Sequence, residues 1–453
     1  MMKPIVVIQI ALAAAITLHP GCSRREGSPA GGSPVTQPDA ASPAPDDGPC
    51  AIVLLPQEGH SKLDGDISRL QARAAAASDP VPHLERLGWL FIAKGRQAAD
   101  PGFFKIAEAC AQCMDSRRPG SPEALLLRGH VSHSLHRFAD AEAAARELVR
   151  VRESPFDHGL LGDALMEVGR LDEAAASYQK MMDLKPCLQS YARAAHVRWL
   201  RGDLEGATGL LRMATRTAST RDPEAAAWAH ARLALHELQL GDARAARRAA
   251  ETALAFQEDH AAALLVMGRV LLAEKELPRA VEVLGRAAGR SPLPEVEWAL
   301  ADALRAAGEE KDALSVEARL EKDGARDDPR TFALYLSTRG KEPDTALRLA
   351  EEELEVRRDV FTHDASAWSL FCAGRAQESL LPMERALAEG TRDARLFLHR
   401  GLIARSLGDA EGASKWLGAA SELERMLLPS EQDLLSRPAG RLRSVSLSTP
   451  TNE

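Results

Sequence analysis

The feature that most constrains this chain is a set of tight-turn residues that returns at a nearly constant interval between residues 95 and 408. Seven of the nine intervals are 32 to 34 residues long, and the other two are 41 and 39. An interval of this length fits one helical hairpin per repeat, with the turn between its two helices. The ten predicted turn residues are Gly95, His136, Gly169, Gly202, Gly241, Lys275, Gly308, Gly340, Gly374 and Gly408.

Small residues stand at two fixed distances from these turns. Seven residues before each turn there is always a Gly or an Ala, namely Gly88, Gly129, Gly162, Ala195, Ala234, Gly268, Ala301, Ala333, Ala367 and Gly401. Five residues after the turn, seven of the ten repeats have an Ala, namely Ala141, Ala174, Ala207, Ala246, Ala280, Ala313 and Ala413. Small side chains on two antiparallel helices let their axes approach closely, while the turn residue ends the first helix. The pattern therefore predicts an array of closely packed helical hairpins.

Two units carry a fuller pattern, which adds large apolar residues at fixed positions and a closing Pro. One unit has Leu161-Gly162, Leu165, Gly169, Ala174, Tyr178 and Pro186, and the other has Met267-Gly268, Leu271, Ala280, Leu284 and Pro292. Both resemble the tetratricopeptide repeat, a unit of about 34 residues. The resemblance covers residues 80–427 and implies an all-α fold, a right-handed superhelical solenoid of about ten hairpins. Two units depart from it: extra residues stretch the first, and Thr345 replaces the second Ala in the eighth.

Composition supports helices and narrows the functional classes. Aromatic residues make up 4% of the chain, and residues 80–427 lack the β-branched runs that form strands. The net charge of -8 comes from interspersed acidic and basic residues rather than from a basic stripe, so we expect no nucleic-acid partner. No nucleophile elbow, phosphate-binding loop, dinucleotide turn or zinc-protease motif occurs. We therefore predict a protein that is not an enzyme and needs no cofactor.

The first 22 residues read as a signal peptide. Lys3 precedes an apolar stretch from Ile5 to Leu18, which is too short to span a bilayer. The segment ends in a Cys context that resembles the bacterial lipobox, although His19 stands where that motif prefers Leu. The resemblance implies lipidation of Cys22 and export to the cell envelope, at the outer membrane and facing the periplasm or the surface. The alternative is ordinary cleavage near residues 13–15, which would release a soluble protein.

The remaining segments flank the array. Residues 23–49 are rich in Pro, Ser and Gly without apolar periodicity, so we expect a disordered tether. Residues 50–79 contain a short apolar run and a helical pattern, and we expect this N-terminal capping segment to pack against the first repeat. Residues 428–453 read as a polar, frayed tail.

Cysteines and histidines offer the remaining candidate chemistry. Cys110 and Cys113 form a C-x-x-C motif late in a predicted helix, where no helix N-terminus activates a thiolate. We interpret them as small packing residues, with a local disulfide as the alternative. His130, His133 and His136 recur every third residue, so two could share a metal ion, but no nearby acidic residue completes the set. We therefore predict no metal site.

Tetratricopeptide arrays bind partners along a concave groove built from the first helix of each hairpin. The outward positions of those helices hold nine predicted groove residues: Trp89, His130, His133, His196, Trp199, Trp228, Trp298, Trp368 and Phe371. Exposed large aromatic side chains are enriched at contact sites, although some of these could instead pack between helices. We predict a non-catalytic scaffold that is tethered in the bacterial envelope and binds protein or peptide segments in this groove. The alternatives are a metal- or small-ligand-handling module centred on His130 and His133, or a regulatory subunit of a separate enzyme.

Overall fold

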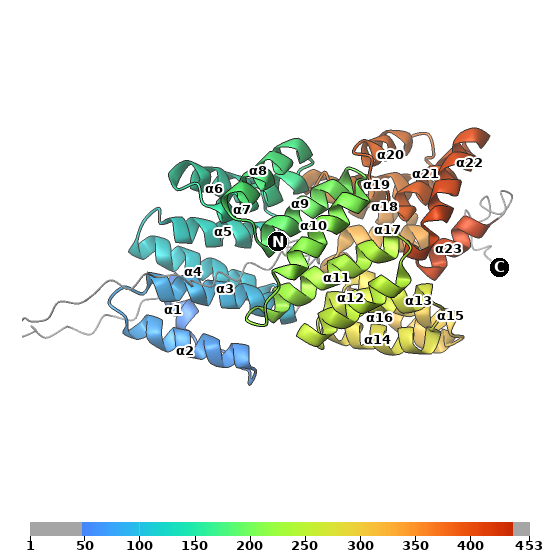
Figure 1. Cartoon of the computed structure of the whole chain (residues 1–453). Helices are drawn as coiled ribbons and strands as arrows, with labels where there is room; N and C mark the ends of the chain where they lie inside the picture. Colours follow the sequence, from blue (N-terminus) through green and yellow to red (C-terminus); the bar gives the residue numbers. More distant parts are fainter. Residues whose placement is uncertain (1–47, 99, 438–453) are drawn as a thin grey trace, which may run out of the picture.

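Helical hairpins account for nearly all of the described chain. The computed structural model describes residues 48–98 and 100–437, and it contains α-helices and one short 3-10 helix but no strand within those ranges. Ten antiparallel hairpins follow one another as predicted, and we number them 1 to 10 (Figure 1). Their helices are α3 (Val81–Ala98) and α4 (Gly102–Arg117), α5 (Pro122–Ser134) and α6 (Phe138–Val151), α7 (Pro155–Glu167) and α8 (Leu171–Leu184), α9 (Leu188–Leu200) and α10 (Leu204–Arg216), α11 (Pro223–Gln239) and α12 (Ala243–Phe256), α13 (Ala261–Ala273) and α14 (Leu277–Arg290), α15 (Pro294–Ala306) and α16 (Glu310–Asp327), α17 (Pro329–Arg339) and α18 (Pro343–Val356), α19 (Val360–Cys372) and α20 (Leu380–Leu387), α21 (Ala394–Ser406) and α22 (Ala410–Glu422).

Nine of the ten predicted turn residues have the left-handed backbone that ends the first helix of a hairpin, with φ between 57° and 86°. His136 and Lys275 adopt it at φ 57° and 60° even though neither is a glycine. The prediction is wrong for Gly95, which lies inside α3. This helix continues to Ala98, so α4 begins only at Gly102, seven residues after the predicted turn.

The small residues lie where the two helices of a hairpin, or of neighbouring hairpins, touch. A Cβ added at Gly162 would lie 2.3 Å from Cε1 of Tyr178, and one at Gly268 would lie 2.4 Å from Leu284. The seven Ala residues predicted after the turns are all buried. In hairpin 8 the second helix begins three residues after the turn residue Gly340 instead of two, and Glu342 is also left-handed. Ala346 rather than residue 345 therefore fills the small-residue position. The helices therefore approach one another closely at the small residues that the spacing predicted.

A segment of two helices precedes the array. It consists of α1 (Pro49–Leu54), which packs on α4, and α2 (Lys62–Ala76), which packs on α3. A disulfide joins Cys50 of α1 to Cys113 of α4. The C-x-x-C motif therefore forms no local bridge, and Cys110 is a buried free thiol. The predicted signal peptide, Cys22 and most of the predicted tether lie outside the described residues, which contain no helix long and apolar enough to cross a membrane.

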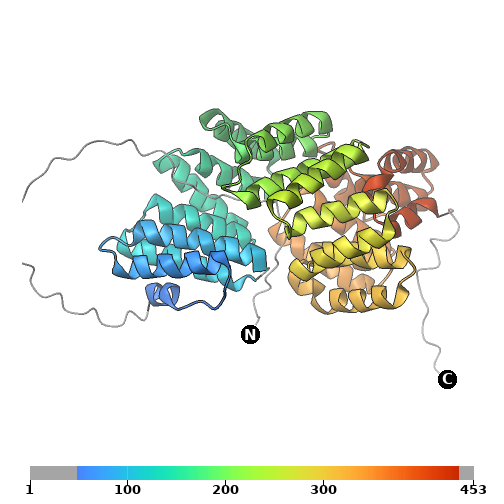
Figure 2. The same cartoon turned by 60° about the horizontal axis from the view of Figure 1, so that its bottom comes forward.

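The array curls until its C-terminal hairpins lie inside the curve of the earlier ones (Figures 1 and 2). The connection after α18 reaches hairpin 3, where the backbone N–H of Arg358 donates to the carbonyl of Glu167 at 2.9 Å. The connection before α21 reaches hairpins 4 and 5, where Thr391 donates to the carbonyl of Leu200 and Gln239 donates to the carbonyl of Arg392. The concave side is therefore largely occupied by the chain itself.

The C-terminal segment completes this closure instead of fraying. After the short 3-10 helix η1 (Glu424–Met426), α23 (Pro429–Ser436) packs against hairpins 7 and 8. Ser430 donates through its backbone N–H and its hydroxyl to Asp302, at 2.9 and 2.6 Å. Glu431 is fully buried and forms an ion pair with Arg395. The first part of the expected polar tail thus belongs to the core.

Candidate functional site

Most of the predicted groove residues are buried, so the expectation that they are exposed is wrong. Seven of the nine are less than 9% exposed: His130, His133, His196, Trp199, Trp228, Trp298 and Trp368. The other two, Trp89 and Phe371, are partly buried. Closure of the array covers Trp199 and Trp298, which contact Phe361 of hairpin 9 and Ser430 of α23. His130, His133 and Trp368 instead pack against rings of their own or an adjacent hairpin. Whether any of them contacts a partner stays a prediction.

The buried tryptophans make specific contacts within the chain. The indole N–H of Trp298 donates to Ser430 at 3.1 Å, and that of Trp199 donates to Gln239 at 2.8 Å. Trp368 stacks on His399 with ring centroids 4.0 Å apart. Shortening Trp298 or Trp368 to Ala would therefore leave a cavity in the core, and the loss of folding stability would obscure any loss of binding.

The histidines that suggested a metal site pack against aromatic rings. His130 lies edge-on to Trp89 at 5.1 Å and His133 edge-on to Phe138 at 5.3 Å. Burial lowers the pKa of His130 to about 3 and also lowers the pKa of His133, so both imidazoles are neutral at pH 7. Within the described ranges, no group of three His, Cys, Asp or Glu side chains could hold a metal ion.

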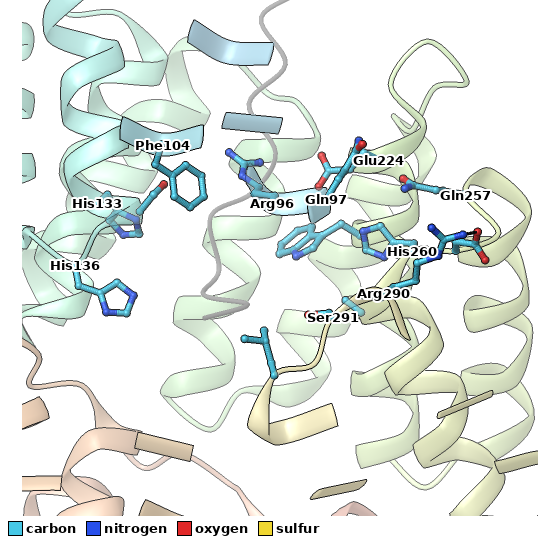
Figure 3. A pocket seen from close by; sticks show the side chains of 16 residues that line it. Arg96, Gln97, Phe104, His133, His136, Glu224, Gln257, His260, Arg290 and Ser291 are labelled. Carbon is cyan, nitrogen blue, oxygen red and sulfur yellow. Dashed lines mark hydrogen bonds and ion pairs between the residues drawn. The ribbon is translucent and has the colours of Figure 1, made fainter. Parts of the chain in front are cut away.

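An N-terminal cavity of about 230 Å³ remains open between the beginning and the middle of the array (Figure 3). Hairpins 1 and 2 contribute one wall, and hairpins 5 and 6 with the connection to hairpin 7 contribute the other. Its lining mixes aromatic, apolar and charged side chains and includes Arg96, Gln97, Phe104, His136, Glu224, Trp228, Gln257, His260, Arg290 and Leu293. Such a mixture suits a segment with both apolar and polar side chains.

Burial shifts the ionisation of two groups in this cavity. It raises the pKa of Glu224, although nearby Arg96 opposes the shift. It also lowers the pKa of His260 to about 4. His260 is the N-cap of α13, and its Nδ1 accepts a hydrogen bond from the backbone N–H of Ala263 at 3.2 Å. This cap requires an unprotonated Nδ1, so it depends on the neutral imidazole.

A central cavity of about 220 Å³ lies deeper, between hairpins 3 to 6 and the inward-folded hairpins 8 to 10. It is lined by five arginines and five acidic residues: Arg232, Arg269, Arg330, Arg357 and Arg395 with Glu167, Glu295, Asp359, Asp364 and Asp393. Arginines and acids therefore balance in number. Trp199 and Phe361 stack on one another in its wall, with ring centroids 5.4 Å apart.

One face of α11 links these cavities. Glu224 and Trp228 line the N-terminal cavity, and Arg232 and Leu235 line the central cavity. A smaller cavity of about 70 Å³ contains Trp228, Arg232 and Leu235 and so lies between the two. These residues are spaced by three or four positions, which places them on one side of a helix. The space that the chain leaves open on the concave side is therefore a row of cavities along α11.

Arg232 and the other arginines of the central cavity are not among the residues predicted from the sequence. The register that selected Trp228 also places Arg232 on the same helix face, four residues later, so that signal was available. The same signal was available for the arginines of hairpins 6, 8 and 10. Arg269, Arg330 and Arg395 stand 6, 10 and 13 residues before their turns, the same distances as Trp89, Trp298 and Trp228 from theirs. Only the curl of the array brings the three arginines to the same space.

Comparison with known families finds tetratricopeptide repeats in two stretches of the chain. One tetratricopeptide repeat model matches residues 158–186, which cover most of α7 and α8, and another matches residues 231–294, from α11 to the start of α15. No curated protein matches the sequence. Together with the ten helical hairpins, these matches establish a tetratricopeptide-type solenoid.

Several solved structures are similar to the chain at low identity. Human IFIT1, in a dimer with PPP-AAAA, is 12% identical, with 82% of this chain and 96% of that chain covered and a TM-score of 0.46. A tetratricopeptide repeat protein from Parabacteroides merdae is 18% identical over 55% of this chain and 97% of its own, with a TM-score of 0.31. MamA is 17% identical over 36% of this chain and 94% of its own, with a TM-score of 0.30.

Proposed function

We propose that the chain is a non-catalytic scaffold, tethered in a bacterial cell envelope, that binds a segment of a partner protein in the N-terminal cavity. The observation that carries this proposal is the position of that cavity in a tetratricopeptide-type solenoid. It lies on the concave side, which such arrays use for binding, and the C-terminal hairpins leave it open.

The lining of the cavity favours a particular kind of segment. Phe104, Trp228 and Leu293 offer apolar surface, while Arg96, Arg290 and Glu224 offer both signs of charge. A partner segment with one or two large apolar side chains flanked by polar residues would use both features. Because the charges of the lining are mixed, we propose a protein partner rather than a nucleic acid, whose phosphates would require an excess of positive charge.

Site-specific photo-crosslinking tests the partner site. A photoreactive residue replaces Gln97 or Gln257, which line the cavity, and in a separate variant it replaces Glu251, an exposed residue on the outer helix α12. Crosslinks to the same protein from positions 97 and 257, and not from 251, are the expected result. Equal crosslinking from 251 would place the binding surface elsewhere. A mobility-shift assay with single-stranded RNA and DNA tests the exclusion of nucleic acid, and salt-resistant binding would contradict it.

Two observations support the proposed location. The N-terminal sequence resembles a lipoprotein signal that ends at Cys22. In addition, the disulfide between Cys50 and Cys113 is of a kind that persists in oxidising compartments such as the periplasm. Replacing Cys22 by Ala should abolish labelling with a radioactive fatty acid and release the chain from membranes, whereas Cys187→Ala should not. Retention of the Cys22 variant in membranes after a high-salt wash would contradict the proposed lipid anchor.

A further inference from the structure

Arg232 differs from the other arginines of the central cavity in having no acidic partner. Arg357 pairs with Glu167 at 2.7 Å, Arg330 with Asp359 at 2.9 Å and Arg269 with Glu295 at 3.1 Å. Arg395 pairs with Glu431. Arg232 makes no hydrogen bond or ion pair with any described residue, and its guanidinium lies over the ring of Trp199 at 5.8 Å. Arg232 therefore lines the cavity with guanidinium donors that have no acceptor in the described chain.

The remaining acids of the cavity are already engaged. Asp364 contacts His399 at 2.8 Å. Asp393 accepts hydrogen bonds from the backbone at the start of α21. Glu295 is the acidic residue that most affects Arg232 electrostatically, but it is held by Arg269. None of the acids that line the cavity is thus left over for Arg232.

Two histidines beside Arg232 are also incompletely satisfied. His196 lines the same cavity, and its buried Nδ1 has no hydrogen-bond partner among the described residues; neither ring nitrogen of His236 has one there either. Burial and the nearby charge of Arg232 lower the pKa of both histidines, so their imidazoles are neutral. Burial also lowers the pKa of Arg232 to about 10, which leaves it charged at pH 7. Buried polar groups normally have partners, so several unsatisfied groups in one place indicate a binding site.

We propose that the central cavity binds a small organic monocarboxylate, whose carboxylate accepts hydrogen bonds from the guanidinium of Arg232. A carboxylate matches the planar, forked arrangement of guanidinium donors. The stacked Trp199 and Phe361 form the apolar part of the wall, against which the body of the ligand packs. This site is separate from the partner-binding N-terminal cavity and goes beyond the scaffold function.

The charges and the size of the cavity decide between this ligand and other anions. The lining carries as many acids as arginines, so a ligand with one negative charge disturbs its charge balance less than a ligand with two. A phosphate monoester or a nucleotide carries at least one further negative charge, which would face Asp359, Asp364 and Asp393. The volume of about 220 Å³ is below the range of about 300 to 1,000 Å³ that is common for drug-sized ligands, so the ligand is small.

Calorimetry and tryptophan fluorescence with the full-length chain test the proposal, with benzoate and phenylacetate as the probes and inorganic phosphate and AMP as dianionic comparisons. At least one of the two carboxylates should bind and change the emission of the buried tryptophans, because Trp199 lies in the wall. Arg232→Met should weaken this binding about tenfold or more, and Arg232→Lys should weaken it less because the charge remains. Arg244→Met, at an exposed position on the neighbouring α12, is the matched control and should bind like the parent.

Thermal melting separates a binding role from a structural one. Without a ligand, Arg232→Met should melt at the same temperature as the parent or at a higher one, because it removes a half-buried charge that has no acidic partner. A lower melting temperature together with unchanged carboxylate binding would overturn the proposal. So would tighter binding of phosphate than of either carboxylate, or no binding of either carboxylate up to about 10 mM. Should Arg232→Met fail to fold, carboxylate binding by Arg232→Lys is compared with that of the parent. Equal binding by the two proteins would then overturn the proposal.

Discussion

Gly162 and Gly285 both lie inside helices, but only Gly162 faces a neighbouring side chain. A Cβ at Gly162 would lie 2.3 Å from the ring of Tyr178, whereas a Cβ at Gly285 would have no atom of a neighbouring element within 4 Å. At the scale of single residues, contact geometry therefore decides whether a helical glycine is needed or only tolerated.

Replacing each of these glycines by Ala tests that distinction. Gly162→Ala should lower the free energy of unfolding by about 1 to 3 kcal/mol, because the ring of Tyr178 must move. Gly285→Ala should raise it by about 0.4 to 1 kcal/mol, because Ala favours the helix and restricts the unfolded chain. Urea denaturation followed by circular dichroism measures both. Equal effects of the two substitutions would show that the register of small residues does not control packing.

His260 gives a pH-dependent prediction at the same scale. Its pKa is lowered to about 4 by burial, below the ordinary value of 6.5, so the folded state favours the neutral imidazole. The contribution of the neutral His260 imidazole to folding stability is fully present above about pH 6.5 and is lost as the pH falls towards 4. His260→Asn keeps an N-cap acceptor without a titrating group. When the pH is lowered from 7.5 to 5, the free energy of unfolding of the variant should therefore rise by about 1 to 2 kcal/mol relative to that of the parent.

Melting temperatures at both pH values measure this difference. The exposed His60→Asn serves as the control and should differ from the parent by the same amount at pH 7.5 and at pH 5. If His260→Asn also shows no change between the two pH values, the imidazole is not buried as a neutral cap.

At the scale of elements, α23 shows how a short helix can close an array. Its length of 8 residues makes it marginal in isolation, but Ser430 and Glu431 attach it to two inner helices. Ser430 bonds to Asp302 and Trp298 of α15, and Glu431 pairs with Arg395 of α21, while Asp302 in turn contacts Arg339 of α17 at 2.6 Å. The helix is therefore held by buried polar contacts rather than by its own propensity.

Glu431→Gln should destabilise the protein by about 3 kcal/mol or more, because it leaves the guanidinium of Arg395 buried without its carboxylate. Asp433→Asn, an exposed position on the same helix, is the matched control and should change stability by less than about 0.5 kcal/mol. Chemical denaturation provides the two values. A similarly small loss of stability in both variants would mean that this ion pair does not hold α23 in place.

At the scale of the whole molecule, the turns of hairpins 3 and 4 support the later hairpins. A Cβ at Gly169 would lie 2.6 Å from the carbonyl oxygen of Arg358, and one at Gly202 would lie 2.5 Å from that of Gly390. Gly308 and Gly374 have the same left-handed backbone, with φ of 84° and 81°, but nothing lies near their absent Cβ atoms. Two of these turns therefore take part in closure and two do not.

The double variants Gly169→Ala/Gly202→Ala and Gly308→Ala/Gly374→Ala separate closure from turn strain. Both double variants should lose about 1 kcal/mol or more of folding stability at each site, because Ala disfavours the left-handed backbone. Only the first pair also pushes the C-terminal connections away from hairpins 3 and 4. It should increase the radius of gyration measured by small-angle X-ray scattering and make the central cavity more accessible, while the second pair should leave the radius unchanged. An unchanged radius in both would contradict this view of closure.

Local features were predictable from the sequence because the residues of a repeat contact mainly their own hairpin and the next one. The left-handed turns at Gly169 and Gly408, and the buried Ala174 and Ala280, followed from spacing alone, since each residue acts within one hairpin or against the next. The extended α3 departed from the pattern at Gly95, where the first repeat carries extra residues.

The residues of the concave side could not be assigned in this way. Trp199 and Trp298 occupy the inner positions that the register gave them, but whether an inner position is open or buried depends on how far the array curls. Small rotations between successive hairpins accumulate along the solenoid, and their sum brings Arg358 to Glu167 and Ser430 to Trp298. The sequence by itself determined the hairpins and their register, while only the tertiary structure decided which inner side chains became core and left Arg232 facing a cavity.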